Sequence, residues 1–178
     1  MNKILSFIIF LALTISGAFA QTKPASQLSF GAEFGFPTGR TASIYGSVIG
    51  GSTKLEIPVS SSSVFLTLTS GFSIYMVKLT YTGNASAAAF IDPLEVGGKY
   101  YFSKLGYFEG DVGASSEINS NYSAAKTALI FAPIIGFSAP TSKHKATIDI
   151  SLRGDCRVES DGMIAQIAAR VAYRFGLK

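Results

Sequence analysis

The feature that most constrains this chain is a strict alternation of apolar and polar positions near its C-terminal end. From residue 163 to residue 175 every second side chain is apolar: Met163, Ala165, Ile167, Ala169, Val171, Tyr173 and Phe175. The polar residues Gln166, Arg170 and Arg174 lie four positions apart on the other face. That spacing also suits an amphipathic helix, but a helical step of about 100° would place Met163 and Tyr173 within or beside the polar arc. The period of two therefore predicts a β-strand.

Seven further segments show strand-like patterns and are separated by stretches rich in turn residues. They are 28–35, 41–58, 64–77, 92–102, 107–115, 127–138 and 145–153. The alternation changes parity near Gly50 and Gly51, which predicts a bulge or bend there. The segment 127–138 is apolar on both faces, and Pro133 weakens it as a central strand of an open sheet. Together with the last strand, these segments make eight, an even number.

The lengths of the connections also alternate. Short connections follow the second, fourth and sixth strands, whereas longer ones follow the third, fifth and seventh, over 78–91, 117–126 and 154–162. The first connection, FPTGR, is short and breaks the pattern. Short turns at one end and longer loops at the other are typical of outer-membrane barrels. The sequence therefore predicts an all-β fold, namely a single eight-stranded antiparallel up-and-down transmembrane β-barrel.

The N-terminal residues predict export from the cytoplasm. Lys3 precedes an apolar run from Ile4 to Ile15, and the small residues that follow end in Ala18-Phe19-Ala20, so 1–20 is expected to be a signal peptide. Residues 21–27 then form an N-terminal lead-in, and 28–178 form the barrel domain. Without Lys3, the remaining 14 basic and 11 acidic residues leave a net charge of +3. This mild, scattered charge argues against a nucleic-acid partner.

The polar faces of the strands carry charges of both signs in equal number. The acidic residues are Glu33, Glu56, Glu95, Glu109, Asp111 and Asp149, and the basic residues are Lys54, Lys99, Lys145, Arg153, Arg170 and Arg174. Balanced charge and many glycines suit a small, closed lumen, because buried charges are tolerated when they are paired. We therefore expect a lumen charge network that includes Glu33, Glu95, Lys99, Glu109, Asp111, Asp149, Arg153, Arg170 and Arg174. In a closed barrel the last strand pairs with the first, so Arg170 and Arg174 would face Glu33 and form either a structural plug or a proton or ion gate.

Aromatic residues gather at three strand ends. They are Tyr100, Tyr101 and Phe102, then Tyr107 and Phe108, and finally Tyr173 and Phe175. All three groups fall at the end with the short turns, where an aromatic girdle of a membrane barrel belongs. The ordinary preference of aromatic residues for strands is the alternative explanation.

Several stretches resemble the outer-membrane β-barrel ("porin family") proteins of Gram-negative bacteria. They are FGAEFGFPTGR, DPLEVGGKYYF, GYFEGDVGAS and the strand-final VAYRFGLK. The resemblance implies a barrel inserted into the bacterial outer membrane by the barrel-assembly machinery, with the last strand as its recognition signal. By that resemblance Tyr173 and Phe175 would supply the aromatic part of this assembly signal, although the chain ends on Lys178 rather than on an aromatic residue. The family shares no catalytic residues.

Other motifs do not predict chemistry. The single histidine, His144, has no nucleophile and orienting group around it in the sequence, as a hydrolytic triad needs. One His and the single cysteine, Cys156, are too few soft ligands for a metal site. Cys156 is expected in an external loop as an exposed thiol. We interpret the tripeptide RGD at 153–155 as a chance occurrence and not as an adhesion motif. We therefore predict no catalytic, cofactor-binding or metal-binding residues and no enzymatic activity.

The combined prediction is a small outer-membrane barrel with a charge-filled lumen and a structural role or a role in surface interactions through its loops. Its expected partners are outer-membrane lipid, the barrel-assembly machinery during biogenesis and an extracellular partner at the loops. One alternative is a barrel that binds a small hydrophobic ligand, either soluble in the periplasm or in the membrane, and another is a narrow ion channel. A lipid-modifying barrel enzyme would need a nucleophile and base at the loops, where His144 does not lie.

Overall fold

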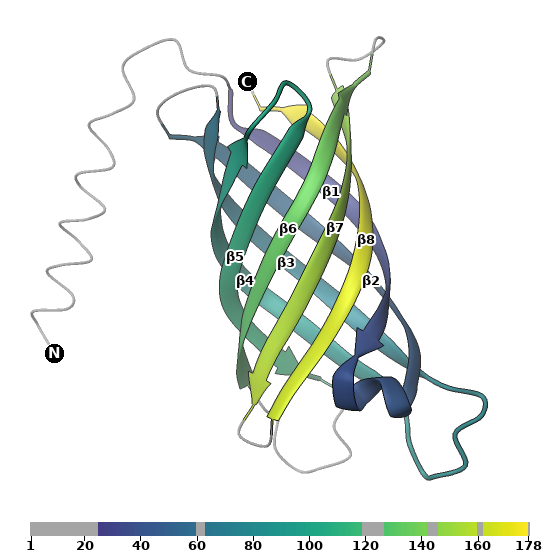
Figure 1. The fold of residues 1–178 in the computed structure, drawn as a ribbon. Helices are drawn as coiled ribbons and strands as arrows, with labels where there is room; N and C mark the ends of the chain where they lie inside the picture. The colour runs from purple at the N-terminus through teal and green to yellow at the C-terminus, as the bar shows by residue number, and fades with distance from the viewer. Residues whose placement is uncertain (1–24, 60–62, 119–126, 142–145, 160–161, 178) are drawn as a thin grey trace, which may run out of the picture.

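The computed structural model describes residues 25–59, 63–118, 127–141, 146–159 and 162–177. They form eight strands and one short 3-10 helix (Figure 1). In chain order these elements are β1 (Gln27–Thr38), η1 (Gly39–Ser43), β2 (Tyr45–Pro58), β3 (Val64–Val77), β4 (Ala88–Tyr101), β5 (Gly106–Glu117), β6 (Thr127–Pro140), β7 (Ala146–Glu159) and β8 (Gly162–Gly176). Among the described residues no helix is long and apolar enough to cross a membrane. The proposed signal peptide, 1–20, lies outside the described residues.

The eight strands form one closed barrel in sequence order. Each strand pairs antiparallel with the next, and β1 closes the ring by pairing with β8 from Gln27 opposite Gly176 to Thr38 opposite Ala165. Closure leaves no strand edge unpaired, so all eight strands can exchange backbone hydrogen bonds on both sides. The prediction of a single eight-stranded antiparallel up-and-down barrel is confirmed as a fold.

The two ends of the barrel differ (Figure 1). Both described chain ends, the turn 102–105 and the strand ends at Pro58, Val64, Pro140 and Ala146 lie at one end, which we call the terminus end. The helix η1, the connection 78–87 and the strand ends at Glu117, Thr127, Glu159 and Gly162 lie at the other end, which we call the loop end.

The strands extend further toward the loop end than the sequence predicted. β4 begins at Ala88, so the connection predicted at 78–91 is shorter, and β7 continues to Glu159, so the loop predicted at 154–162 is wrong. The strand persists because Asp155 and Arg157 turn into the lumen and find hydrogen-bond partners there. Cys156 therefore lies within β7, where it pairs with Phe131 and Ala165, and not in an external loop.

The parity change near Gly50 is not a bulge. Gly50 and Gly51 pair continuously with β3, and the irregularity in this pairing falls between Tyr45 and Ser47. The strand itself keeps its parity, with Val48, Lys54 and Glu56 all facing inward. Only the apolar–polar pattern changes, because the inward Val48 is apolar and joins an apolar cluster inside the barrel.

β4 contains an irregularity that its sequence does not predict. The pairing of β4 with β5 shifts register between Ile91 and Leu94. A β-bulge changes which side chains face inward along a strand. As a result Asp92 and Glu95, three positions apart, are both buried in the lumen.

Pro133 is accommodated within β6. The pairs of Phe131 with Cys156 and of Ile134 with Arg153 keep a single register across the proline. Proline removes one backbone donor, and the flanking pairs hold the strand in place. The rest of β6 alternates strictly, with Ala128, Ile130, Ala132 and Ile134 buried.

Candidate functional site: the charged interior of the barrel

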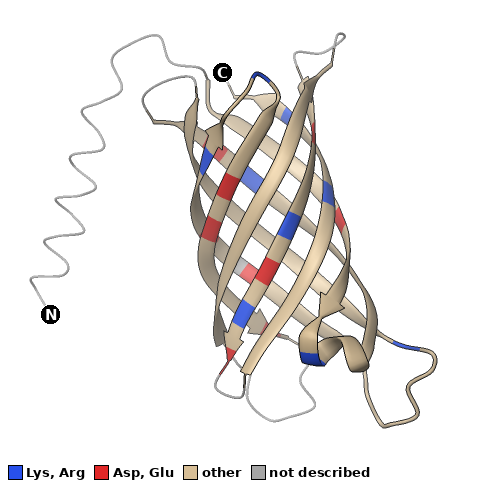
Figure 2. Cartoon of the chain, in the orientation of Figure 1, with Lys and Arg blue, Asp and Glu red and all other residues tan. Residues whose placement is uncertain are grey.

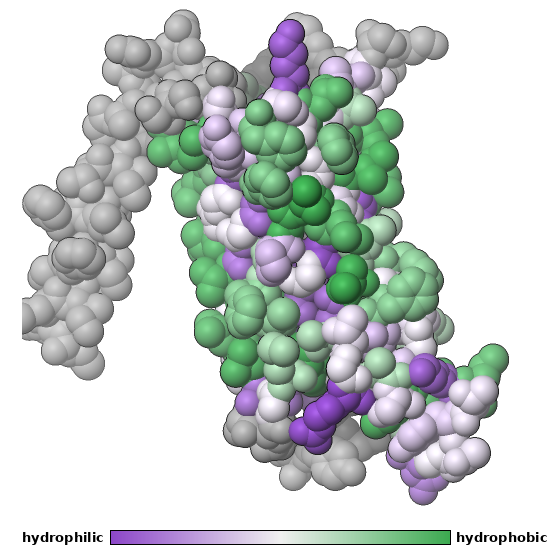
Figure 3. All heavy atoms as spheres, in the orientation of Figure 1, coloured by the Kyte–Doolittle hydropathy of each residue, from purple (hydrophilic) through white to green (hydrophobic). Residues whose placement is uncertain are grey.

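The barrel has an inverted distribution of polarity. Large apolar residues are exposed along its outer wall, among them Phe30, Phe72, Val112, Ile150 and Val171, and Figure 3 shows apolar residues over much of the wall in one view. Charged residues of both signs are spread along the strands (Figure 2). Those buried in the lumen are Lys54, Glu56, Asp92, Glu95, Lys99, Glu109, Asp111, Asp149, Arg153, Asp155, Arg157, Arg170 and Arg174. A protein whose wall faced water would show the reverse arrangement.

The terminus-end cluster joins β2, β4, β7 and β8 through two cations and two carboxylates. Lys99 Nζ lies 2.8 Å from Glu56 Oε1 and 3.6 Å from Asp149 Oδ2. Arg174 Nη1 lies 2.9 Å from Glu56 Oε2 and 3.5 Å from Asp149 Oδ2. The Lys99 ammonium also lies 3.8 Å from the centre of the Tyr107 ring, so a cation–π contact adds to the ion pairs.

A chain of hydroxyl groups continues from Arg174. Arg174 donates to the Tyr101 hydroxyl, which lies 3.1 Å from the Ser138 hydroxyl. Ser138 in turn donates to Asp149 at 2.5 Å. This chain links β8, β4, β6 and β7 across the lumen, so side chains far apart in the sequence hold the terminus end together.

The middle cluster is built around Lys54 of β2. Lys54 forms an ion pair with Glu109 and lies 3.8 Å from Asp111 Oδ2. Asp111 also accepts hydrogen bonds from Thr67 at 2.8 Å and from Thr69 at 3.1 Å. One cation thus faces two carboxylates, and threonine hydroxyls supply part of the compensation that a buried carboxylate needs.

Arg153 of β7 connects the middle of the lumen with its loop side. Its Nη2 donates to both carboxylate oxygens of Glu95, at 2.6 and 2.7 Å. Its Nε donates to Asp155 at 2.5 Å, and its Nη1 lies 3.8 Å from Asp111. Gln166 donates a further hydrogen bond to Asp155 at 2.5 Å. Arg153 is therefore the cation shared by three buried carboxylates.

Arg170 and Glu33 meet across the seam that closes the barrel, where β1 and β8 place them directly opposite each other. Arg170 Nε lies 3.5 Å from Glu33 Oε1, and the Ser52 hydroxyl bridges them at 2.8 and 2.5 Å. The expectation that Arg174 also faces Glu33 is wrong. The register places Arg174 opposite Ser29, nearer the terminus end, where it pairs with Glu56.

Arg157 and an apolar layer close the loop end. Arg157 donates to hydroxyls of Ser115, Tyr75 and Ser73 at 2.8, 2.7 and 2.9 Å, and its Nη2 lies 3.3 Å from an oxygen of Asp92. Beside it lies a buried cluster of Val48, Tyr75, Ala88 and Phe90, against which Tyr45 and Ile164 pack. We call this set of residues, with Arg157, the loop-end cap.

Little space remains between the clusters. The interior cavity lined by Glu33, Glu95, Arg153 and Gln166, among others, has a volume of about 10 Å³, roughly the room for one water molecule. Larger cavities occur at the ends: about 640 Å³ at the terminus end and about 450 Å³ beside η1 and the start of β8. The described part of the lumen is therefore filled by side chains, as expected for eight strands.

Sequence reasoning missed three charged residues of the interior: Asp92, Asp155 and Arg157. Asp92 has the same parity as the apolar face of its strand, and it turns inward because of the irregularity in β4. The other two share the parity of Arg153, and continuing the alternation beyond it would have found them. Lys145, the remaining basic residue assigned to the polar faces, lies outside the described residues, as does His144.

Only some of the aromatic residues assigned to the girdle face outward. Tyr100, Phe102, Phe108 and Tyr173 are exposed on the outer wall, and Phe175 is partly buried beside Phe30. Tyr101 and Tyr107 instead belong to the lumen. The reason is the pleat: consecutive residues of a strand point to opposite faces, so a run of three aromatic residues cannot all face outward.

The motifs without predicted chemistry also have defined places. Arg153 and Asp155 of the RGD tripeptide are buried in the lumen and pair with each other, so the motif is inaccessible to an adhesion receptor. In the described part of the chain, no group of three or more His, Cys, Asp or Glu residues is arranged to hold a metal ion.

No protein-family model matches this chain, and a comparison with curated proteins also gave no match. Solved structures do match. Ail of Yersinia pestis, an outer membrane protein studied in a phospholipid bilayer nanodisc, is 13% identical, with a TM-score of 0.56 over 86% of this chain and 100% of Ail. Neisserial surface protein A is 11% identical, with a TM-score of 0.55 over 85% of this chain and 97% of that protein. The outer membrane protein OprG of Pseudomonas aeruginosa is 10% identical, with a TM-score of 0.52 over 87% and 98%. The chain therefore has the fold of Gram-negative outer-membrane β-barrel proteins.

Proposed function

We propose that this protein is an outer-membrane β-barrel whose sealed, charged interior is structural and whose loop end carries its interactions. The observation that supports this most strongly is the inverted polarity of the wall: exposed phenylalanine, isoleucine, leucine and valine outside, and buried paired charges inside. In water that outer wall would be a very large apolar patch, whereas lipid solvates it.

The packing of the lumen supports a structural role over conduction. Four groups of paired charges occupy the lumen, and they include Lys99 with Arg174, Lys54, Arg153 and Arg170. The loop-end cap fills the lumen beyond them with Tyr75, Phe90 and Arg157. The charged interior also gives no support to a hydrophobic ligand in the lumen, because such a ligand would leave these charges without compensation.

The loop end supports an interaction with an extracellular partner. Leu79, Ile118 and Met163 are exposed apolar side chains at that end, and Lys78 and Glu159 add charge beside them. At the other end, Tyr173 and Phe175 of the last strand are the residues we assign to recognition by the barrel-assembly machinery. The proposal gives the protein no catalytic role.

The proposal is tested first by membrane fractionation and by the gel mobility of the purified protein in detergent, with and without boiling. We expect the protein in the outer-membrane fraction and a faster-migrating band in the unboiled sample. Release without detergent, with no change in mobility on boiling, would contradict a membrane barrel. The apolar wall would then be covered by protein.

The sealed lumen is tested separately by current recordings in planar lipid bilayers. We expect no discrete channel openings from the purified protein under conditions in which a known porin conducts. Regular single-channel currents would contradict the structural role of the charge clusters and favour the narrow ion channel.

A further inference from the structure

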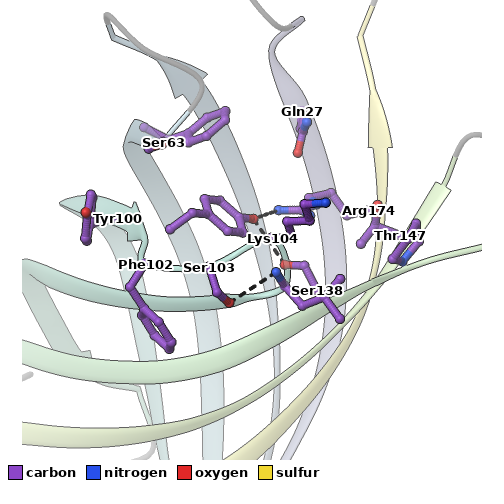
Figure 4. Close-up of a pocket in the computed structure, with 13 residues that line it drawn as sticks. Gln27, Ser63, Tyr100, Phe102, Ser103, Lys104, Ser138, Thr147 and Arg174 are labelled. Atoms are coloured by element: carbon purple, nitrogen blue, oxygen red, sulfur yellow. Dashed lines mark hydrogen bonds between the residues drawn. The ribbon is translucent and has the colours of Figure 1, made fainter.

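The cavity at the terminus end has features that the structural role of the lumen does not require. Its volume is about 640 Å³, within the range of small-molecule sites. Its lining includes Phe65, Tyr101, Ser138, Thr147 and Arg174. Figure 4 shows Gln27, Ser138, Thr147 and Arg174 gathered on one side of it. We call it the vestibule.

Arg174 lines this vestibule and has one donor without a partner. Arg174 is 6% exposed, and its ion pairs with Glu56 and Asp149 and its hydrogen bond to Tyr101 all use Nη1. Its Nε is buried and has no hydrogen-bond partner among the described residues. A buried N–H group of a charged side chain calls for an acceptor.

The charge of the lining identifies the kind of acceptor. The two charged side chains among the described lining residues, Arg174 and Lys104, are both basic. Glu56 and Asp149 are already paired with Lys99 and Arg174. An anion in the vestibule would meet a guanidinium, an ammonium and hydroxyl groups, the combination that favours phosphate esters.

The same cavity also reaches the outer wall. Tyr100 and Phe102 belong to its lining, although they are 53% and 46% exposed on the apolar face of the barrel. A ligand that fills the whole cavity therefore combines an anionic group inside the mouth with an apolar part outside. A phospholipid has this chemistry.

We propose that the vestibule binds a phosphate ester and that the ester is the headgroup of a phospholipid at the terminus end of the barrel. The Arg174 guanidinium and Lys104 contact the phosphate, and the acyl chain lies against Tyr100 and Phe102. The choice of a lipid rests on the proposed membrane location, whereas recognition of the phosphate does not.

The test follows the Nε–H signal of Arg174 by NMR in the full protein, in maltoside micelles that contain no phosphate. The probes are dihexanoyl phosphatidylglycerol, glycerol phosphate and uncharged dihexanoylglycerol. We expect a saturable shift with the phospholipid, at least tenfold weaker binding of glycerol phosphate and no shift with the uncharged lipid. The variant Lys104→Gln should bind the phospholipid at least fivefold more weakly. Lys104 lies in an exposed turn, so this variant should fold.

The matched control is Lys78→Gln, which removes the same charge at the loop end and should leave binding unchanged. Equal binding of glycerol phosphate would support the phosphate site and replace the lipid by a soluble ester as its source. The absence of a saturable shift with both phosphate probes, a shift with the uncharged lipid or equal weakening in Lys78→Gln would overturn the proposal. Because glycerol phosphate needs no membrane, its result separates a failure of this site from a failure of the proposed location.

Discussion

Replacing Arg153 with methionine should destabilise the barrel more than any surface change, because three carboxylates share this cation. Its contacts with Glu95, Asp155 and Asp111 span 2.5 to 3.8 Å within a buried interior. Removing one partner of a buried ion pair costs about 3–5 kcal/mol, because the remaining charge stays buried without compensation. We therefore expect Arg153→Met to lower the free energy of unfolding by about 4 kcal/mol.

A second substitution separates two contributions to the lost stability: the missing contacts and the unpaired charge that stays buried. Glu95 accepts both of its hydrogen bonds from Arg153, so Glu95→Gln in the Arg153→Met background removes the charge left behind. We expect the double variant to recover about half or more of the loss, since replacing both partners of a buried pair is often close to neutral. The recovery is incomplete because Asp155 and Asp111 still lose a cation.

The assay is equilibrium unfolding by urea in detergent micelles, read by circular dichroism, because the chain has no tryptophan. With a slope of about 2 kcal/mol per M, the single variant should shift the midpoint by about 2 M. Lys104→Met, an exposed cation, serves as the control and should change stability by less than about 0.5 kcal/mol. A loss below about 1 kcal/mol in Arg153→Met, or no recovery in the double variant, would refute the reasoning.

Three further predictions concern other parts of the wall and lumen. Tyr75→Phe removes the hydroxyl that accepts from Arg157 at 2.7 Å, so the free energy of unfolding should fall by about 1.5–3 kcal/mol in the same urea assay. Gly97→Ala places a methyl group against a carboxylate and a backbone carbonyl of β5, so it should lower the free energy of unfolding by about 1–3 kcal/mol. Gly98→Ala should be nearly neutral, because its methyl group meets no atom within 4 Å. Cys156 should react slowly with a water-soluble maleimide in lipid and fully after unfolding, because it lies within a strand of the wall.

Each of these has a contradicting result. An unchanged midpoint in Tyr75→Phe would mean that the hydroxyl is not needed to compensate the arginine. Equal effects of the two glycine substitutions would mean that the inward and outward faces of β4 are not as assigned. Rapid labelling of Cys156 in the folded protein would indicate that this residue lies in an external loop, as the sequence predicted.

The alternation of apolar and polar residues went far in predicting the fold. It identified strands in all eight places, and it assigned Glu95, Lys99, Arg153 and Arg170 to the face that the structure buries. The predictions failed where alternation is locally interrupted or masked. The irregularity of β4 hid Asp92, and an inward Val48 imitated a bulge near Gly50.

The sequence by itself determined that this chain forms strands, that their number permits a closed barrel and that one face of each strand carries charge. These properties are local, because the pleat repeats every two residues whatever the strand packs against. Only the tertiary structure decided which charges meet. Arg174 pairs with Glu56, 118 residues away, and not with Glu33. That choice depends on the register at which β8 closes on β1 and on distances across the lumen, and both arise only when the ring is complete.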